Sequence, residues 1–159
     1  MPKPPVNHYP NIGDIGEDLV AQWLQSTGWE ILHRRFSCRW GEIDIIAQYQ
    51  DTTSNQLPVL AFVEVKTRSL GSWDGGGREA ITSKKQIKLG QTAGIYLTQY
   101  PDKAEYSCRF DVAIVSCRRI SHQLRGETFN QQCLASLSIS GYELQLQEYI
   151  PAAFDYSIV

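Results

Sequence analysis

The clearest strand signal in the chain lies at residues 59–68, where an apolar run ends in charged residues. Five apolar residues in succession, Val59–Val63, are typical of a buried strand. Because side chains along a strand alternate between its two faces, Glu64, Lys66 and Arg68 share one face. A carboxylate and an ammonium held side by side at the end of such a strand form either a structural ion pair or half of a metal-dependent active site.

Two helices are predicted, one before the first strand and one after the third. Apolar positions repeat at helical spacing after Asn11, a good N-cap, and Gly28 is placed to end that helix in a left-handed conformation. A second helix is predicted over residues 83–99, with Thr82 or Ser83 as its cap.

Four strands and a C-terminal hairpin complete the pattern, and together they define the expected fold class. The strands are predicted over residues 29–36, 42–47, 59–68 and 108–115, and the hairpin over residues 134–140 and 142–150 about Gly141. The order helix, three strands, helix, strand and C-terminal strands predicts one α/β (mixed α+β) domain over residues 11–159, with a mixed central sheet flanked by helices.

Several segments carry weaker patterns. Residues 1–10 are rich in proline and are expected to be a flexible segment. Residues 69–77 contain four glycines and are expected to be a flexible connection, with a mobile flap over a substrate as the alternative. Arg118, Arg119 and Arg125 surround a polar stretch that we expect to be a loop, and residues 116–141 are expected to hold an inserted hairpin. The tail at residues 151–154 is expected to dock as a short turn.

An aspartate stands inside an otherwise apolar strand, at a position where this residue type is depleted. Asp44 shares a strand face with Glu42 and Ile46, and a buried carboxylate without a partner is costly. A hairpin with residues 59–68 can bring Asp44 and Glu64 onto one face, with Lys66 one step further along. Two carboxylates suit Mg²⁺ (or Mn²⁺), which keeps waters and phosphate oxygens as its other ligands. Lys66 could then help to activate a metal-bound water, and the carboxylates are expected to favour its charged form.

Basic residues form local clusters that could contact phosphates. The second helix carries Lys84, Lys85 and Lys88 in its first turns, where cations oppose the helix dipole and phosphate oxygens would be bound favourably. A solvated basic face explains these lysines equally well. We predict a nucleic-acid-contacting surface formed by Arg68, Lys84, Lys85, Arg34 and Arg35. On residue type alone, Glu17 on the first helix is as readily a solvated surface acid as a functional one, and Arg109 with Asp111 is a structural pair.

Composition restricts the class of protein. The 159 residues are 42% hydrophobic and 20% charged with a net charge of −2, so a nucleic-acid site must be a local basic patch rather than a general property of the surface. The four cysteines form no CxxC pair, which argues against a zinc ribbon and favours reduced thiols in a cytoplasmic protein. No signal peptide and no apolar run of membrane-spanning length is evident, so no membrane partner is expected.

The pattern of Asp44 followed by Glu64 and Lys66 at the end of the next strand resembles the PD-(D/E)xK nuclease superfamily. Over about residues 12–154 the chain also resembles the YraN-type family of small bacterial proteins. The matching blocks are Gly16-Glu17 with Ala21, Gly41–Asp44, Phe62–Arg68, the lysine at the start of the second helix, Arg109–Val112 and Tyr149–Phe154. That family is similar to archaeal Holliday-junction resolvases.

These resemblances imply a restriction-endonuclease-like core and a metal-dependent endonuclease. Its expected reaction is hydrolysis of DNA phosphodiester bonds, with branched or structured DNA as the substrate. They also place Glu17 in the metal site with Asp44 and Glu64, beside the catalytic Lys66, and imply a two-fold homodimer. Two alternatives stay open: a non-catalytic nucleic-acid-binding or adaptor protein on the same fold, and a Glu64–Lys66 pair that is only structural.

Overall fold

The computed structural model describes residues 11–69, 81–120 and 133–155. Residues 1–10, 70–80 and 121–132 lie outside the described residues, together with the predictions made for the N-terminal segment, most of the glycine-rich connection and the middle of segment 116–141. The elements are α1 (Ile12–Ser26), β1 (Glu30–Cys38), β2 (Gly41–Tyr49), β3 (Val59–Ser69), α2 (Ser83–Gln99), the short 3₁₀ helix η2 (Pro101–Lys103), β4 (Ser107–Arg119), β5 (Ala135–Ile139) and β6 (Tyr142–Phe154).

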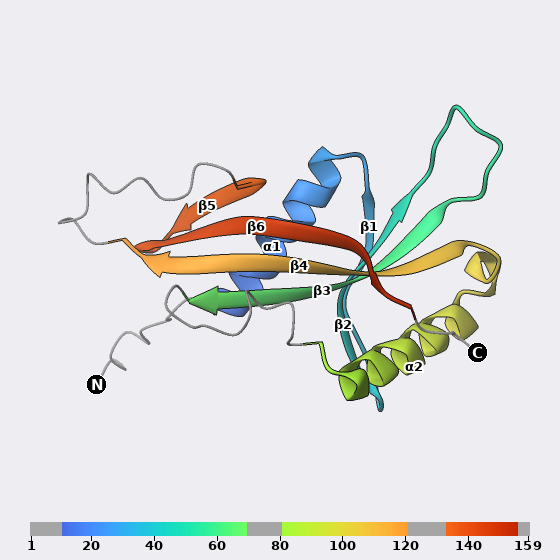
Figure 1. Ribbon diagram of the computed structural model, residues 1–159. Coiled ribbons are helices and arrows are strands. Elements are labelled where there is room, and N and C mark those ends of the chain that lie inside the picture. The colour runs from blue at the N-terminus through green and yellow to red at the C-terminus, as the bar shows by residue number, and fades with distance from the viewer. Residues whose placement is uncertain (1–10, 70–80, 121–132, 156–159) are drawn as a thin grey trace, which may run out of the picture.

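The described strands form one mixed sheet of six strands in the order β1-β2-β3-β4-β6-β5 (Figure 1). β3 and β4 run parallel, and α2 lies in the connection between them, while the other neighbouring strands are antiparallel. The mixed α/β class and the order of elements predicted from the sequence are confirmed. No helix in the described ranges is both long enough and apolar enough to cross a bilayer.

Both helices begin where the sequence predicts. The Asn11 side chain accepts a hydrogen bond from the Asp14 N–H (3.3 Å), and Gly28, just beyond the end of α1, adopts a φ of 100°. Thr82 caps α2 by accepting from the Lys85 N–H (3.2 Å). These are contacts between residues close in sequence, which is why the local pattern was sufficient to place them.

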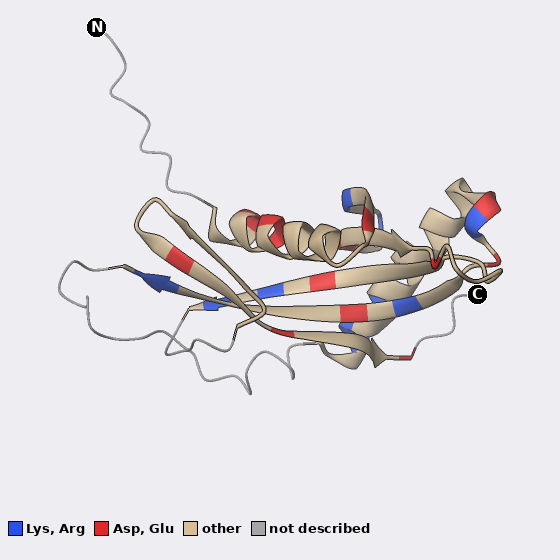
Figure 2. Ribbon diagram, turned by 90° about the horizontal axis from the view of Figure 1, so that it is seen from above, with Lys and Arg blue, Asp and Glu red and all other residues tan. Residues whose placement is uncertain are grey.

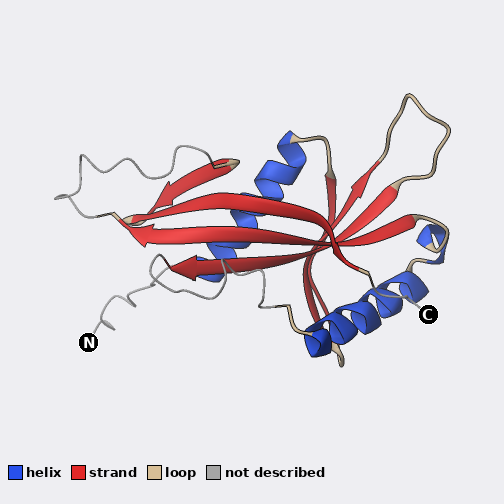
Figure 3. Cartoon of the chain, in the orientation of Figure 1, coloured by secondary structure: helices blue, strands red, loops and turns tan. Residues whose placement is uncertain are grey.

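The two helices cover opposite faces of the sheet (Figures 2 and 3). α1 buries Leu19, Val20 and Leu24 against Val63 of β3 and further strands. α2 buries Leu89, Ala93 and Tyr96 against Phe62 of β3 and the aliphatic and aromatic side chains around it. Alternation along β3 therefore sends Val63, Val65 and Thr67 toward α1, and Phe62, Glu64 and Lys66 toward the α2 face.

Two predictions for the C-terminal part were wrong. Arg118 and Arg119 belong to β4 rather than to a loop, and Arg118 forms an ion pair with Glu143 on β6 (3.1 Å). The tail at residues 151–154 is the end of β6 and pairs with β4 as far as Phe154, rather than docking as a short turn. In both cases a neighbouring strand distant in sequence supplies the hydrogen bonds that extend the element.

Candidate active site at the end of the β2–β3 ladder

The ladder between β2 and β3 ends beside two acidic residues. Its last pair joins Ile45 to Val63, so Asp44 and Glu64 occupy the next opposed positions. Beyond that point β3 remains paired with β4, and β2 remains paired with β1. The Asp44 carboxylate accepts a hydrogen bond from the Val65 N–H (2.8 Å), which ties it to β3 where the ladder stops.

Gly16 brings α1 close to β3 at the same place. A Cβ atom at residue 16 would clash with Thr67 Oγ1 and would lie 3.4 Å from Thr67 Cβ, so glycine is needed for this approach. The next residue, Glu17, is only 9% exposed. Glu17 is therefore a buried acid at the sheet, which excludes the solvated surface residue that was one of the two alternatives left open by the sequence.

Three carboxylates meet in this region. Oxygens of Glu17, Glu42 and Asp44 all lie within 4.8 Å of one another, and they come from α1 and β2. Glu42 was not among the site residues predicted from the sequence, although its position two residues before Asp44 on one strand was the signal that could have found it. The group offers closely spaced oxygen ligands of the kind that hard divalent cations prefer.

The pKa of Asp44 reflects this crowding. Burial is the main cause that raises the pKa of Asp44 to about 8, and the negative charges of Glu64 and Glu17 add to it. The hydrogen bond from the Val65 N–H acts in the opposite direction. Asp44 therefore ionises with difficulty in this setting, and a nearby cation would favour its charged form.

Two lysines contact Glu64, which is 7% exposed. The Glu64 carboxylate lies 3.3 Å from Lys66 Nζ and 2.5 Å from Lys85 Nζ. Burial and the neighbouring Lys85 lower the pKa of Lys66, and the opposing influence of Glu64 does not restore it. Burial also acts against the charge of Lys85, but its hydrogen bond to Glu64 leaves the pKa of Lys85 raised. The Glu64 carboxylate does favour a charged Lys66, as the sequence predicted, but burial and the neighbouring Lys85 outweigh it, so the pKa of Lys66 lies below its ordinary value.

The predicted phosphate-contacting residues lie in different surroundings. Lys85 is in the acidic site, Lys84 is exposed beside it on the first turn of α2, and Arg68 is half-buried two residues after Lys66 on β3. Arg34 and Arg35 lie against α1. They form ion pairs with its acids, among them Arg35 to Glu17 at 2.8 Å and Arg34 to Asp18 at 2.9 Å.

Arg109 and Asp111 form the structural pair that the sequence predicted. Arg109 Nε lies 3.1 Å from the Asp111 carboxylate, which is 1% exposed and also accepts hydrogen bonds from the Tyr149 hydroxyl (2.6 Å) and the Ala152 N–H (2.9 Å). Burial and the negative charge of Asp111 raise the pKa of Tyr149, which keeps its hydroxyl a donor. This network ties β6 to β4.

Comparison with known proteins places the whole site within one family. Residues 16–115 match the family described as Uncharacterised protein family UPF0102. This chain belongs to that family. A UPF0102 protein of Trichormus variabilis is 65% identical over 145 residues, which cover 91% of this chain and 95% of its own length. A UPF0102 protein of Synechocystis is 39% identical over 151 residues, covering 91% of this chain and 97% of its own length.

The UPF0102 match confirms the YraN-type resemblance seen in the sequence. It spans the acids of α1, β2 and β3 and the lysines of β3 and α2. Similarity to the relatives extends further along the chain than the family match does. The family description names no activity, so the chemistry has to be argued from the geometry of this site.

Proposed function

We propose that this UPF0102 protein is a divalent-metal-dependent endonuclease that hydrolyses phosphodiester bonds in branched or otherwise structured DNA. The observation that supports it is the convergence of acids from α1, β2 and β3 with Lys66 and Lys85, at the point where the β2–β3 ladder ends. Side chains from four separate elements meet there, and the two lysines belong to the residue type that binds phosphates as point charges.

The acids fit a divalent cation. Glu17, Asp44 and Glu64 would hold Mg²⁺ or Mn²⁺, and Glu42 offers a further oxygen. The raised pKa of Asp44 supports this assignment, because a cation would reverse the unfavourable influence of the surrounding negative charges. Such an ion would polarise a phosphoryl oxygen and make a water more acidic.

The lysines have different roles in this proposal. Lys66 is the proton carrier: its lowered pKa increases the fraction of Nζ that is neutral and can accept a proton from an attacking water. Lys85, whose charge is favoured, orients Glu64 and can turn toward a phosphate oxygen once a metal ion occupies the acids. Lys84 and the α2 N-terminus provide further positive charge for the DNA backbone.

The direct test is cleavage of labelled DNA. Purified protein would be incubated with Mg²⁺ or Mn²⁺ and with a four-way junction, a flap and a single strand. Cleavage is expected for the wild type and for Lys88→Ala, an exposed lysine on the same helix, whereas Asp44→Asn and Glu64→Gln should be inactive. Lys66→Ala should fold normally but lose roughly 10²- to 10⁴-fold in rate, as for a lost acid–base group. The absence of cleavage of every substrate at enzyme excess would refute the nuclease.

One observation favours the alternative of a non-catalytic nucleic-acid-binding protein. Each of the two most buried acids of the site is already paired with two cations: Glu64 with Lys66 and Lys85, and Glu17 with Arg34 and Arg35. Such a protein would retain DNA in a salt-dependent manner without cutting it, and the retention would survive Asp44→Asn.

A further inference from the structure

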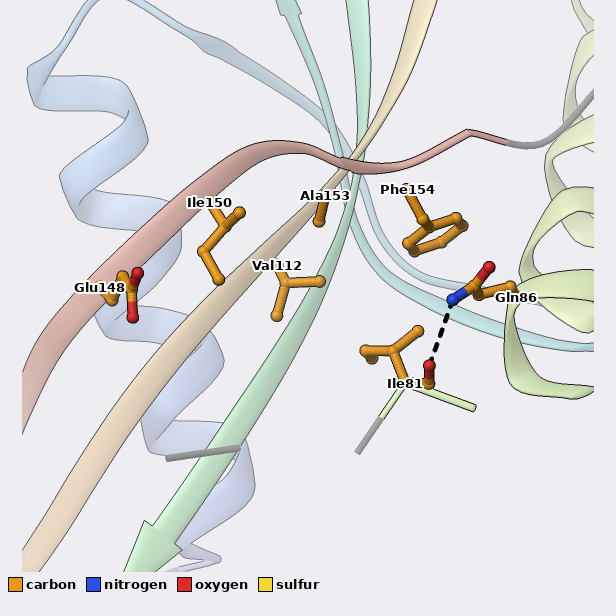
Figure 4. Close-up of a pocket in the computed structure, with 7 residues that line it drawn as sticks. All are labelled: Ile81, Gln86, Val112, Glu148, Ile150, Ala153 and Phe154. Atoms are coloured by element: carbon orange, nitrogen blue, oxygen red, sulfur yellow. Dashed lines mark hydrogen bonds between the residues drawn. The ribbon is translucent and has the colours of Figure 1, made fainter. Parts of the chain in front are cut away.

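A pocket of about 390 Å³ lies on the α2 side of the sheet (Figure 4). Five of its seven lining side chains are apolar, and α2 and β6 contribute one polar side chain each. The lining residues are Ile81, Gln86, Val112, Glu148, Ile150, Ala153 and Phe154. At the small end of the range for ligand sites, this volume suits a single aromatic ring system with its substituents.

The strand register places the pocket beside the acidic site. Glu64 is paired with Val112, and Val112 with Ile150, so these three residues form one row across β3, β4 and β6. Lys66 is likewise paired with Ile114, and Ile114 with Glu148, so these three residues form a second row. Since neighbouring strands lie about 4.8 Å apart, the pocket is roughly one to two strand spacings from Glu64. If a phosphate lay at Lys66 and Lys85, the base of the same nucleotide would therefore be able to reach the pocket.

A bulge in β6 forms one wall of the pocket. Phe110 pairs with Phe154 and Val112 with Ile150, so residues 151–153 lie opposite the single residue Asp111. Ala152 adopts a φ of 47°, and its N–H is held by the Asp111 carboxylate. The bulge is thus held by a network on the α1 face, formed by Arg109, Asp111 and Tyr149. This network fixes the pocket wall, which lies on the α2 face of the sheet. Bulges are often found beside active sites, where they redirect side chains.

The chemistry of the lining favours a flat base over a phosphate. Phe154 stacks on Phe110, with ring centroids 5.0 Å apart, and presents an aromatic surface at the pocket. The Gln86 Nε2 donates to the Ile81 carbonyl (3.2 Å), as Figure 4 shows, so its Oε1 is left as a hydrogen-bond acceptor. The Glu148 side chain at the opposite end is acidic, which disfavours a phosphate in the pocket itself. The Gln86 acceptor and an aromatic ring match a base that carries an exocyclic amino group.

We propose that this pocket receives the unpaired base of a nucleotide whose phosphate lies at Lys66 and Lys85. This inference rests on the proposed function, which it deepens by naming the substrate class: DNA with an unstacked, unpaired nucleotide at the scissile position. Stacking at Phe154 would hold the ring, and the Gln86 acceptor would favour cytosine, adenine or guanine, which donate from an exocyclic amino group, over thymine, which donates only from its ring N3–H. Gln86 follows Lys85 on the first turn of α2, so the same helical turn contacts both the base and the phosphate.

The test compares duplexes that differ only at one unpaired nucleotide. Binding is measured by fluorescence anisotropy in EDTA, where cleavage cannot occur, for a duplex with one bulged cytosine, one bulged thymine or one bulged abasic nucleotide. The wild type is expected to prefer the cytosine bulge over the abasic bulge by roughly 5- to 150-fold, the range for one base-stacking contact. It should prefer cytosine over thymine by about fivefold, as for one hydrogen bond.

Two variants and a control assign these preferences to the pocket. Ala153→Phe fills the pocket and should remove the base-over-abasic preference while leaving binding of the abasic duplex unchanged. Gln86→Ala should reduce the cytosine-over-thymine preference. Gln99→Ala, at the exposed end of the same helix, should change neither ratio. Circular dichroism and thermal melting establish that each variant is folded.

The outcomes separate this inference from the proposed function. Should DNA bind only with metal, the same ratios are taken from cleavage rates in Mg²⁺. Equal wild-type affinity or rate for base-containing and abasic bulges, or a preference that persists in folded Ala153→Phe, overturns the pocket assignment while the nuclease stands. A wild type that neither binds nor cleaves any of these DNAs overturns both.

Discussion

Replacing Gly16 with alanine should destabilise the protein and move Glu17 away from its partners. The new methyl group would meet Thr67 Oγ1, and Thr67 cannot easily turn aside because a β-branched side chain is stiff at χ1. Overpacking of this kind typically costs about 1–3 kcal/mol, and the gain in helix propensity from glycine to alanine returns about 0.5–1 kcal/mol. We therefore expect a net loss of roughly 1 kcal/mol, and at most about 2.5 kcal/mol, in the free energy of unfolding.

A double-mutant cycle measured by urea unfolding checks the reasoning. Thr67 Oγ1 is buried without a hydrogen-bond partner in the described structure, so Thr67→Ala sacrifices no hydrogen bond. Gly16→Ala combined with Thr67→Ala should recover most of the lost stability, with a coupling of at least about 1 kcal/mol. Gly13→Ala, near the exposed start of the same helix, is the control and should change stability by less than about 1 kcal/mol. Simple additivity of Gly16→Ala and Thr67→Ala would refute the proposed contact.

The same variants should also differ in DNA cleavage. Glu17 follows Gly16 directly, so a displacement of α1 would separate its carboxylate from Asp44. If the proposed metal site is correct, Gly16→Ala should lower DNA cleavage more than its stability loss explains, because displacements near 1 Å can cost about 10²-fold in rate. The Gly16→Ala, Thr67→Ala protein should regain activity together with stability.

Three further predictions concern the charged groups. In EDTA, Asp44 has a folded pKa of about 8 against an ordinary value of 3.8, so its contribution to stability is present below about pH 4 and is lost as pH rises through about 8. In urea unfolding, the free energy of unfolding of Asp44→Asn relative to the wild type should therefore increase between about pH 5 and pH 9, by a few kcal/mol and at most about 6. A difference between the two proteins that does not change with pH contradicts this. Lys85→Ala removes a cause that lowers the pKa of Lys66, so the pH–rate profile of cleavage should move to higher pH, while Lys88→Ala leaves it in place. Asp111→Ala should cost at least about 2 kcal/mol in thermal or urea unfolding, because it leaves a half-buried cation and two further donors without their acceptor; a loss below about 1 kcal/mol would show that water replaces the carboxylate.

The sequence by itself determined the local elements and the central pair of site strands. The cap residues Asn11 and Thr82 and the alternation along residues 59–68 act through neighbours close in the chain, so their effects could be read without a structure. Asp44 was found because a carboxylate within an apolar strand needs a specific partner. The opposition of Asp44 and Glu64 followed from the antiparallel hairpin and its period of two.

Only the tertiary structure decided which charged side chains meet. Glu17 follows the helical pattern equally well as an exposed or a buried acid, and it is buried because Gly16 lets α1 approach β3. The choice of Lys85 from the lysines of α2 depends on how that helix packs over β3. Arg34 and Arg35 both reach α1 because Arg35 adopts a φ of 54°, which interrupts the alternation of β1.

The pocket also depends on contacts between distant segments. Its wall exists because Asp111 on β4 holds a bulge in β6, some forty residues later in the chain. Pro151 is a local signal for a bulge or a strand edge but does not say which, and the sequence pattern of residues 151–154 favoured a turn. Local periodicity thus determines which residues share a face of a helix or strand. Which faces pack against each other depends on segments far apart in sequence, and that packing sets the burial and the charged neighbours of each site residue.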